Sequence, residues 1–230
     1  MSTGPPPQAS ATTQPPSAPP PVSKPPTQEV SFGDDEPPEN RPILNVLQNG
    51  TVIAPLDDAY LAAQSETQRA TDYPYAAPEG AFVLNAGRLT ALDDPGLLVG
   101  RTAVLSVGSN RAPVQLRRKF GDDAIVPVTP AILHDCDIVH AATVSYYGAV
   151  SCTAFPSRGT DVMLNVAWLD DPQLAIMHRT EAVGVAYDYV RMLTGTITHL
   201  PVPSAGGDIV AAAQPVFGYS ARSGVLDLGA

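Results

Sequence analysis

Two segments of the chain carry apolar residues at odd and even positions alike. They are TAVLSVG, residues 102–108, and DVMLNVAWL, residues 161–169. A strand with one face in water alternates between apolar and polar residues, whereas a strand covered on both faces stays apolar throughout. The pattern therefore predicts two buried β-strands.

The first predicted strand runs into a turn that is typical of a helix start. Ser109 and Asn110, which follow Gly108, are good helix N-caps, Pro113 suits a first helical turn and Gly121 suits a helix end. Free N–H groups at such a start, together with the helix dipole, favour a carboxylate or phosphate. Gly-Ser-Asn turns are also common as plain connections. The segment lacks the lysine of a P-loop and the spacing of a dinucleotide-binding glycine motif.

A helix is also expected after the second strand. Asp170 or Asp171 caps it, Pro172 lies in its first turn, and Gln173 is the capping-box partner if Asp170 is the cap. The spacing i, i+3, i+4, i+7 then places four residues on one inward face, namely Leu174, Met177, His178 and Glu181.

The inward glutamate is the candidate catalytic residue. A buried carboxylate is costly unless it pairs with a cation, takes up a proton or lines a cavity, and in a cavity it suits acid/base catalysis. Alternatively, Glu181 turns outward at the helix end or pairs with Arg179 or Arg191. His178 has no matching ligand residues around it, so it is interpreted as a packing residue rather than a metal ligand.

Composition changes sharply along the chain. Of its 25 prolines, 13 fall within the first 42 residues, and residues 1–40 have scarcely a large apolar side chain. We interpret residues 1–40 as a disordered tail, which is either a solvated spacer or a ligand for a proline-reading partner. Residues 41–100 contain short apolar pieces and a short helix within 57–70. They are expected to form an amino-terminal extension of unassigned function, packed on a main domain at 101–230.

Charge and cysteine content exclude several classes of function. The formal charge of −10 argues against a nucleic-acid surface, and Arg117, Arg118 and Lys119 are interpreted as a solvated helix end. The sequence has no membrane-spanning stretch and no signal core, so a cytoplasmic protein without membrane partners is expected. Cys136 and Cys152 are interpreted as ordinary buried thiols, and no metal site is expected.

Taken in order, these features resemble the gamma-glutamylcyclotransferase-like superfamily. The resemblance rests on the strand ending in Gly-Ser-Asn, TAFPSRGTDV at 153–162, the second strand and helix, a glutamate followed by a tyrosine, and PVFGYSARSG at 215–224. It covers about residues 101–225. It implies an α+β fold with a small mixed, partly barrel-like sheet and a few short helices.

The resemblance also implies an activity. Enzymes of this family cyclise a gamma-glutamyl amine, amide or peptide to 5-oxoproline and release a free amine or amino acid, without metal or cofactor. By this resemblance Glu181 is the catalytic acid/base, and the substrate-binding residues are Val107, Gly108, Ser109, Asn110, Arg111 and Tyr187.

Three positions depart from the family pattern. Val107 replaces a tyrosine, Arg111 an apolar residue and Ala182 a glycine. A second hypothesis therefore stays open, in which the same fold serves as a non-catalytic module that binds a small carboxylate or another protein. An inward glutamate favours the enzyme, because a binding module has no need of an acid/base.

Overall fold

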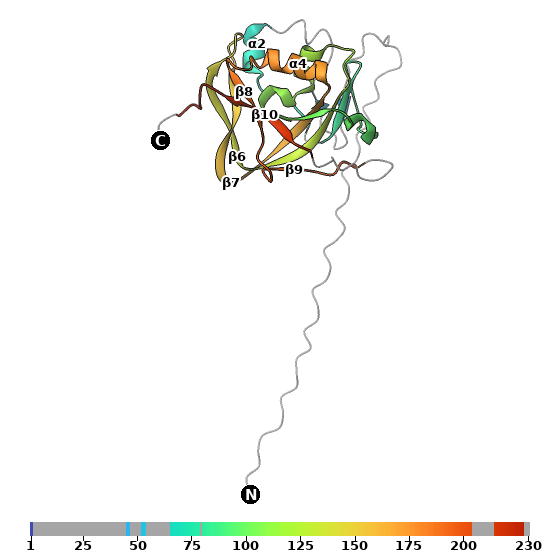
Figure 1. The fold of residues 1–230 in the computed structure, drawn as a ribbon, viewed down its shortest axis with the longest axis vertical. Coiled ribbons are helices and arrows are strands. Elements are labelled where there is room, and N and C mark those ends of the chain that lie inside the picture. Colours follow the sequence, from blue (N-terminus) through green and yellow to red (C-terminus); the bar gives the residue numbers. More distant parts are fainter. Residues whose placement is uncertain (2–44, 47–51, 54–64, 79, 204–213, 228–230) are drawn as a thin grey trace. The chain divides into compact units, whose positions relative to one another are not determined.

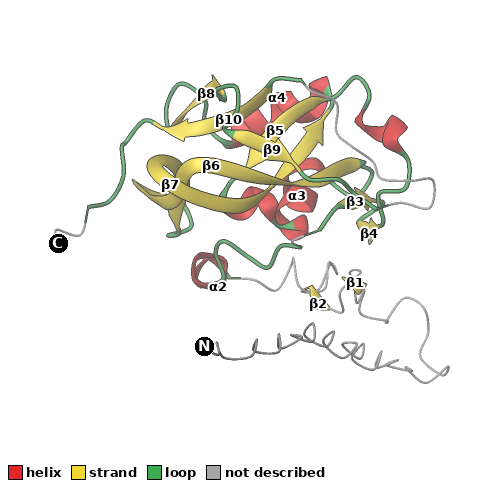
Figure 2. Ribbon diagram, turned by 90° about the horizontal axis from the view of Figure 1, so that it is seen from below, coloured by secondary structure: helices red, strands yellow, loops and turns green. Residues whose placement is uncertain are grey.

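The main element of the described part of the chain is an eight-stranded sheet, with two of the α-helices packed on one of its faces (Figures 1 and 2). The computed structural model describes residues 1, 45–46, 52–53, 65–78, 80–203 and 214–227. The predicted disordered tail at 1–40, with its proline-reading segment, lies outside these residues, Met1 excepted. Residues 57–64 of the helix expected within 57–70 also lie outside the described residues, and residues 66–70 are helical.

The helices, in chain order, are α2 (Glu66–Thr71), the 3₁₀ turns η2 (Pro95–Leu98) and η3 (Gly108–Arg111), α3 (Pro113–Phe120) and α4 (Asp171–Thr180). The strands are β1 (Asn45–Val46), β2 (Val52–Ile53), β3 (Phe82–Asn85), β4 (Arg88–Thr90), β5 (Thr102–Ser106), β6 (Val126–Val144), β7 (Val150–Leu169), β8 (Tyr187–Arg191), β9 (Ile197–His199) and β10 (Val216–Ala221).

The sheet is mixed. Its order is β4-β3-β6-β7-β5-β10-β8, with β9 paired to β6, and β1 and β2 form a separate antiparallel pair. Neighbouring strands of the large sheet are antiparallel except β5 and β10, which are parallel with Ala103 opposite Val216. The longest pairing is the hairpin of β6 and β7, whose register shifts between His134 and Cys136 and again between His140 and Val144. The predicted α+β class with a mixed sheet and few helices is confirmed.

Both faces of the central strands are covered, as the apolar pattern predicts. On β5, Val104 packs with residues of α3 and α4, including Leu116 and Met177. Its neighbours Ala103 and Leu105 point to the opposite face, where Trp168 of β7 is buried. Figure 2 shows α3 and α4 together on one side of the sheet. Two cores therefore lie on the two faces of one sheet.

The helix that follows β7 begins as predicted. Asp170 accepts a hydrogen bond from the backbone N–H of Gln173 at 2.9 Å, and the Gln173 side chain accepts one from the backbone N–H of Asp170 at 3.2 Å. This capping box fixes the start of α4, and Glu181 is its C-cap residue.

The helix after β5 begins later than predicted. Gly108–Arg111 forms the 3₁₀ turn η3, and the N-cap residue of α3 is Ala112, so the expectation that Ser109 or Asn110 caps the helix is wrong. The cause is Pro113, which disfavours helical backbone at the residue before it and makes the helix start at the proline. The end is as predicted, because Gly121 has a φ of 81° at the C-cap.

The described part of the extension expected at 41–100 contributes to the large sheet. β3 pairs with both β4 and β6, with Phe82 opposite Val128, and Phe82 is fully buried. These residues therefore supply an edge of the sheet as well as packing on the core. Among the described helices, none is long and apolar enough to cross a membrane.

Candidate functional site

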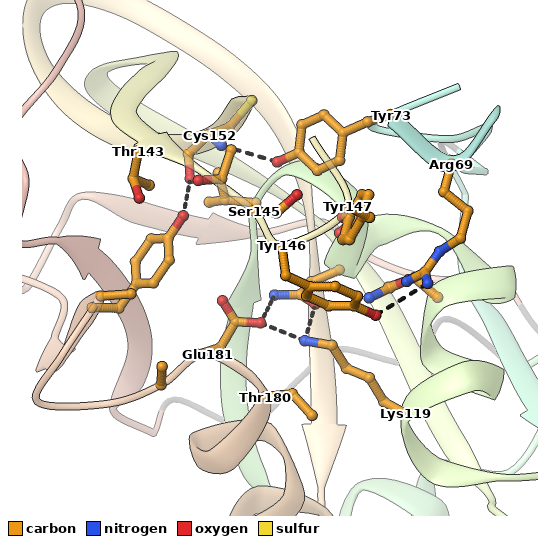
Figure 3. Close-up of a pocket in the computed structure, with 18 of the residues that line it drawn as sticks. Arg69, Tyr73, Lys119, Thr143, Ser145, Tyr146, Tyr147, Cys152, Thr180 and Glu181 are labelled. Carbon is orange, nitrogen blue, oxygen red and sulfur yellow. Dashed lines mark hydrogen bonds and ion pairs between the residues drawn. The ribbon is translucent and has the colours of Figure 1, made fainter. Parts of the chain in front are cut away.

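A pocket of about 590 Å³ lies where the Gly-Ser-Asn turn, the ends of α3 and α4, and the far half of the β6–β7 hairpin meet (Figure 3). The segment at 65–78, which includes α2, forms a further wall. The residues that line the pocket are Arg69, Tyr73, Val107, Ser109, Asn110, Gln115, Arg118, Lys119, Thr143, Val144, Ser145, Tyr146, Tyr147, Ser151, Cys152, Arg179, Thr180, Glu181, Ala182, Ala186 and Tyr187.

Glu181, the predicted catalytic residue, lies in this pocket and contacts the Gly-Ser-Asn turn. The Asn110 side-chain amide donates a hydrogen bond to Glu181 Oε1 at 3.1 Å, although the two residues are 71 positions apart in the sequence. Figure 3 shows the Glu181 carboxylate directed into the pocket. The inward orientation expected for Glu181 is therefore observed, in a residue that ends α4 rather than lying within it.

The cation that pairs with Glu181 is Lys119. Its ammonium group forms an ion pair with Glu181 Oε1, donates to Asn110 Oδ1 at 2.7 Å and lies 3.2 Å from the sulfur of Met177. The side chain of Lys119 is 6% exposed and that of Glu181 is 14% exposed. The expected partners of Glu181, Arg179 and Arg191, do not form this ion pair.

The interpretation of Arg117, Arg118 and Lys119 as a solvated helix end is thus wrong. Successive helix residues point about 100° apart, so adjacent cations reach different surroundings. Arg117 is buried and pairs with Asp122, and this contact lowers the pKa of the Asp122 carboxyl. A sequence signal for Lys119 exists, since it lies three residues after the buried Leu116 and therefore near the inward face of α3.

The turn itself depends on a glycine. Gly108 has a φ of +59°, and a Cβ atom added there would overlap the Tyr73 hydroxyl. That hydroxyl accepts a hydrogen bond from the backbone N–H of Cys152 at 2.9 Å. Burial is the main cause that raises the pKa of Tyr73, and the neighbouring Cys152 is the second. The Tyr73 hydroxyl therefore stays protonated at neutral pH. Gly108 thus lets β7 and the segment at 65–78 approach the turn.

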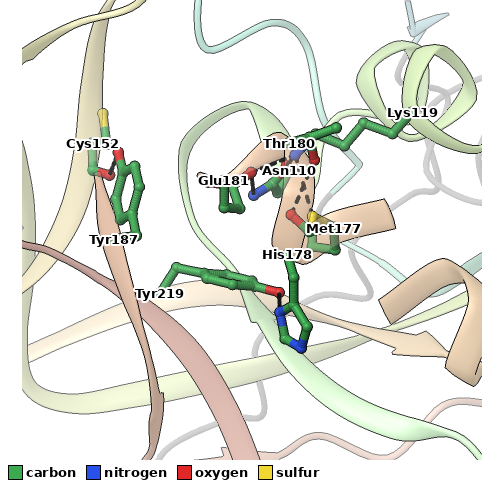
Figure 4. Close-up of polar contacts among 9 residues, drawn as sticks. All are labelled: Asn110, Lys119, Cys152, Met177, His178, Thr180, Glu181, Tyr187 and Tyr219. Atoms are coloured by element: carbon green, nitrogen blue, oxygen red, sulfur yellow. Dashed lines mark hydrogen bonds and ion pairs between the residues drawn. The ribbon is translucent and has the colours of Figure 1, made fainter. Parts of the chain in front are cut away.

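Tyr187, the predicted tyrosine partner, lines the same pocket. It begins β8, and its hydroxyl donates a hydrogen bond to the backbone oxygen of Cys152 at 3.2 Å (Figure 4). Burial raises the pKa of Tyr187, so this group is also a protonated donor at neutral pH. The backbone of Cys152 is therefore held between Tyr73 and Tyr187.

The remaining predicted site residues divide into two groups. Val107, Ser109 and Asn110 line the pocket, whereas Gly108 and Arg111 are not among its lining residues. Arg111 donates from Nε to the side-chain oxygen of buried Asn165 on β7 at 3.0 Å. Its side chain thus tethers the turn to the sheet.

His178 packs among aromatic side chains. The Tyr219 hydroxyl and His178 Nδ1 are 2.9 Å apart (Figure 4). The Tyr189 ring lies edge-on to the imidazole, with centroids 4.5 Å apart. No cluster of three or more His, Cys, Asp and Glu residues that could hold a metal ion occurs among the described residues.

One wall of the pocket was not foreseen from the sequence. Arg69 on α2 donates from Nη1 to the Tyr146 hydroxyl at 3.0 Å, and its guanidinium lies over the Tyr147 ring at 4.4 Å from the centroid. Burial raises the pKa of Tyr147 to about 12. The signal in the sequence was the pairing of tyrosines in YPY, residues 73–75, and YY, residues 146–147.

Chemically, this arrangement offers one carboxylate that can exchange a proton, several protonated tyrosine hydroxyls, and cations along one side. The ion pair contains Glu181 as a carboxylate, which is the form that accepts a proton. The side-chain amide of Asn110 and the ammonium of Lys119 fix its position.

No protein-family model and no curated protein matches the sequence. Among solved structures, a gamma-glutamyl cyclotransferase is 15% identical at a TM-score of 0.36, covering 52% of this chain and 69% of its own. A protein from Arabidopsis thaliana is 18% identical at a TM-score of 0.36, covering 60% of this chain and 74% of its own.

A third match is an uncharacterized protein from Homo sapiens, 16% identical at a TM-score of 0.36, covering 53% of this chain and 66% of its own. Each of these matches covers only part of the chain. The chain is similar in fold to proteins that include a gamma-glutamyl cyclotransferase.

Proposed function

We propose that the chain is a cyclotransferase that converts a gamma-glutamyl compound into 5-oxoproline and a free amine or amino acid. The observation that carries the proposal is the 3.1 Å hydrogen bond from Asn110 of the Gly-Ser-Asn turn to Glu181 in a pocket of about 590 Å³. A pocket of this volume accommodates a small amino-acid derivative.

In the proposed reaction Glu181 relays protons from the attacking nitrogen to the leaving nitrogen. Its carboxylate takes a proton from the α-ammonium of the substrate, and the freed amine attacks the γ-carbonyl carbon to close a five-membered ring. The ring nitrogen then loses a second proton and the bond from the γ-carbon to the leaving nitrogen breaks; both protons end on the leaving nitrogen, which departs as an ammonium group. Water is neither consumed nor released, and the step needs no cofactor.

The other site residues have binding roles in this proposal. The turn at Ser109 and Asn110 holds the α-carboxylate of the glutamyl group. Tyr73 and Tyr187 border the pocket as protonated hydroxyl groups, because burial raises the pKa of each. Lys119 orients Glu181, with the two groups in contact.

The experiment is to incubate the protein with a panel of gamma-glutamyl compounds and to detect 5-oxoproline directly. Glu181→Gln should reduce turnover by ~100- to 10,000-fold, because the amide cannot exchange a proton. Asp123→Asn is the matched control, since it makes the same carboxylate-to-amide change at an exposed position. Full turnover by a folded Glu181→Gln protein would contradict the proposal.

The alternative function is a non-catalytic module that binds a small carboxylate. The buried ion pair of Glu181 favours it, because such a pair can serve stability alone. Binding of a gamma-glutamyl compound without any 5-oxoproline, in the unmodified protein, would select this alternative.

A further inference from the structure

Large apolar side chains are exposed beside the pocket. Val144 and Tyr146 line it, and they are 64% and 80% exposed. Val183 and Val185 are exposed as well, and they belong to the segment 182–186, whose two end residues line the pocket. A group of exposed apolar side chains at a cleft is typical of a ligand-binding groove.

Tyr146 is held in place although its ring is exposed. It lies in the connection between β6 and β7, and its hydroxyl accepts a hydrogen bond from Arg69 Nη1 at 3.0 Å. The Tyr147 ring stands edge-on to the Tyr146 ring, with centroids 5.1 Å apart, and the Arg69 guanidinium lies over the Tyr147 ring. Figure 3 shows the two tyrosines beside Arg69. A ring that is fixed in this way offers its apolar face to a ligand without a further loss of side-chain freedom.

The apolar residues and the proposed catalytic residue come from different elements. Glu181 ends α4 and contacts the Gly-Ser-Asn turn, which is where the proposed function places the glutamyl head. Val144 ends β6. Ser145 separates Val144 from Tyr146 in the sequence, and its hydroxyl oxygen accepts a hydrogen bond from the backbone N–H of Ala149 at 3.0 Å. Since this hydroxyl is engaged within the hairpin, Val144 and Tyr146 offer apolar surface to the part of a ligand beyond its glutamyl head.

We propose that the leaving group of the substrate carries an apolar side chain, which packs against Val144 and Tyr146. This inference rests on the proposed cyclotransferase function. Contact with such a side chain removes apolar surface of both partners from water, and this is favourable in proportion to the area. A polar side chain of the same shape would lose hydrogen bonds to water without gaining partners from Val144 or from the Tyr146 ring. The favoured substrates are therefore gamma-glutamyl derivatives of apolar amino acids or amines.

The test is a competition between two substrates of the same shape. Gamma-glutamylleucine and gamma-glutamylasparagine have branched side chains of similar size without a charge, and both carry the same terminal carboxylate. In an equimolar mixture with the unmodified protein, the initial rates at which leucine and asparagine are released give the ratio of the two kcat/KM values. We expect leucine to be released about three- to tenfold faster, because its two methyl groups become partly buried. A ratio of one, or faster release of asparagine, would overturn the proposal.

Two variants at the pocket locate the effect. Val144→Thr keeps the shape of the side chain but adds a hydroxyl group, so it should bring the ratio towards one. Tyr146→Ser removes the ring and should reduce the ratio as well. Val99→Thr is the matched control, because Val99 is 79% exposed and is not among the residues that line the pocket. Since Val144 and Tyr146 are exposed, both variants should fold, and an unchanged ratio in both would contradict the assignment.

Detection of 5-oxoproline separates this inference from the proposed function. If 5-oxoproline is formed from both compounds at equal rates, the cyclotransferase stands and the apolar leaving group is wrong. If no 5-oxoproline is formed, calorimetric titration of the unmodified protein compares the two affinities. Tighter binding of the leucine compound would then keep the apolar site and exclude the cyclotransferase. Equal affinities, or no binding of either compound at millimolar concentration, would show that both are wrong.

Discussion

Lys119 on α3 and Glu181 at the end of α4 form a buried ion pair, and Asn110 contacts both of them. Asn110 donates to the carboxylate from its amide nitrogen and accepts from the ammonium at its amide oxygen. The three side chains therefore close a ring of polar contacts, in which the loss of any one residue leaves the other two incompletely satisfied.

The first prediction follows from this ring. Lys119→Met keeps an unbranched stem and removes the ammonium, which leaves the buried Glu181 carboxylate without its cation. We expect a loss of about 3–5 kcal/mol in the free energy of unfolding, measured by urea denaturation. Arg88→Met, which removes an exposed cation on β4, is the control and should change stability by less than about 0.5 kcal/mol.

The pair also changes what is expected of Glu181→Gln. If the glutamate were unpaired, its replacement would leave melting unchanged or raise it. With Lys119 buried beside it, the glutamine variant keeps an unpaired ammonium and should melt at a lower temperature. The double variant Lys119→Met with Glu181→Met should regain stability relative to either single variant, and a simple sum of the two losses would argue against direct coupling.

A second prediction concerns the glycine of the turn. Gly108→Ala places a methyl group against the Tyr73 hydroxyl, in addition to the cost of a positive φ. Gly100 is the matched control, because it has a φ of +72° and no atom within 4 Å of an added Cβ. Gly100→Ala should lose about 1 kcal/mol of stability through backbone strain alone.

Gly108→Ala should lose more stability than Gly100→Ala and should also weaken ligand binding, because Tyr73 must leave its hydrogen bond to Cys152. Thermal unfolding and calorimetric titration with a gamma-glutamyl compound measure the two effects. Equal losses in both alanine variants would show that the close approach of Tyr73 is unimportant.

A third prediction separates structure from recognition at Arg111. Arg111→Leu removes the hydrogen bond to Asn165, whose side chain is fully buried, and should lower the free energy of unfolding by about 1–3 kcal/mol. The affinity for a gamma-glutamyl compound should change less than twofold, because Arg111 is not among the residues that line the pocket. A variant that keeps its stability but loses most of its affinity would show that Arg111 binds the ligand.

The fourth prediction concerns pH. Burial lowers the pKa of His199 below its usual 6.5, and both ring nitrogens are buried without hydrogen-bond partners among the described residues, beside Trp168. Below pH 6.5 His199 is therefore protonated in the unfolded chain but stays neutral in the folded chain. Neutral His199 therefore contributes its full share to the stability of the folded protein above pH 6.5, and this contribution is lost as the pH falls towards the lowered pKa.

His199→Leu should flatten the stability curve just below pH 6.5, as followed by denaturant unfolding at a series of pH values. His140→Leu, a change at an exposed histidine on β6, should keep the slope of the unmodified protein. An identical slope in the His199→Leu protein would show that this histidine does not contribute to the pH dependence.

The sequence allowed prediction of local elements whose signals lie within a few residues. The capping box of Asp170 and Gln173 and the helix end at Gly121 are examples, because each depends on neighbours in the chain. The inward position of Glu181 also followed from its spacing to Met177. The predicted start of α3 was wrong, because the effect of Pro113 on the preceding residue outweighed the preference of Ser109 and Asn110 for the N-cap position.

Contacts between distant segments could not be predicted from one sequence. Lys119 looked like part of a solvated cluster because its partner lies 62 residues away. Arg69 and Tyr146 are 77 residues apart and meet because the β6–β7 hairpin extends beyond the sheet core. β3 carried too short an apolar run to show that it pairs with β6. Such pairings are properties of the assembled sheet.

The place of β10 in the sheet has a consequence for biosynthesis. β10 lies between β5 and β8, so Tyr187 at the start of β8 is held against the sheet by residues 216–221. A ribosome delivers Glu181 and Tyr187 well before it delivers β10. The nascent chain can therefore complete the β6–β7 hairpin and the helices α3 and α4, but Tyr187 is held in the pocket wall only after β10 has been translated and has inserted beside β5.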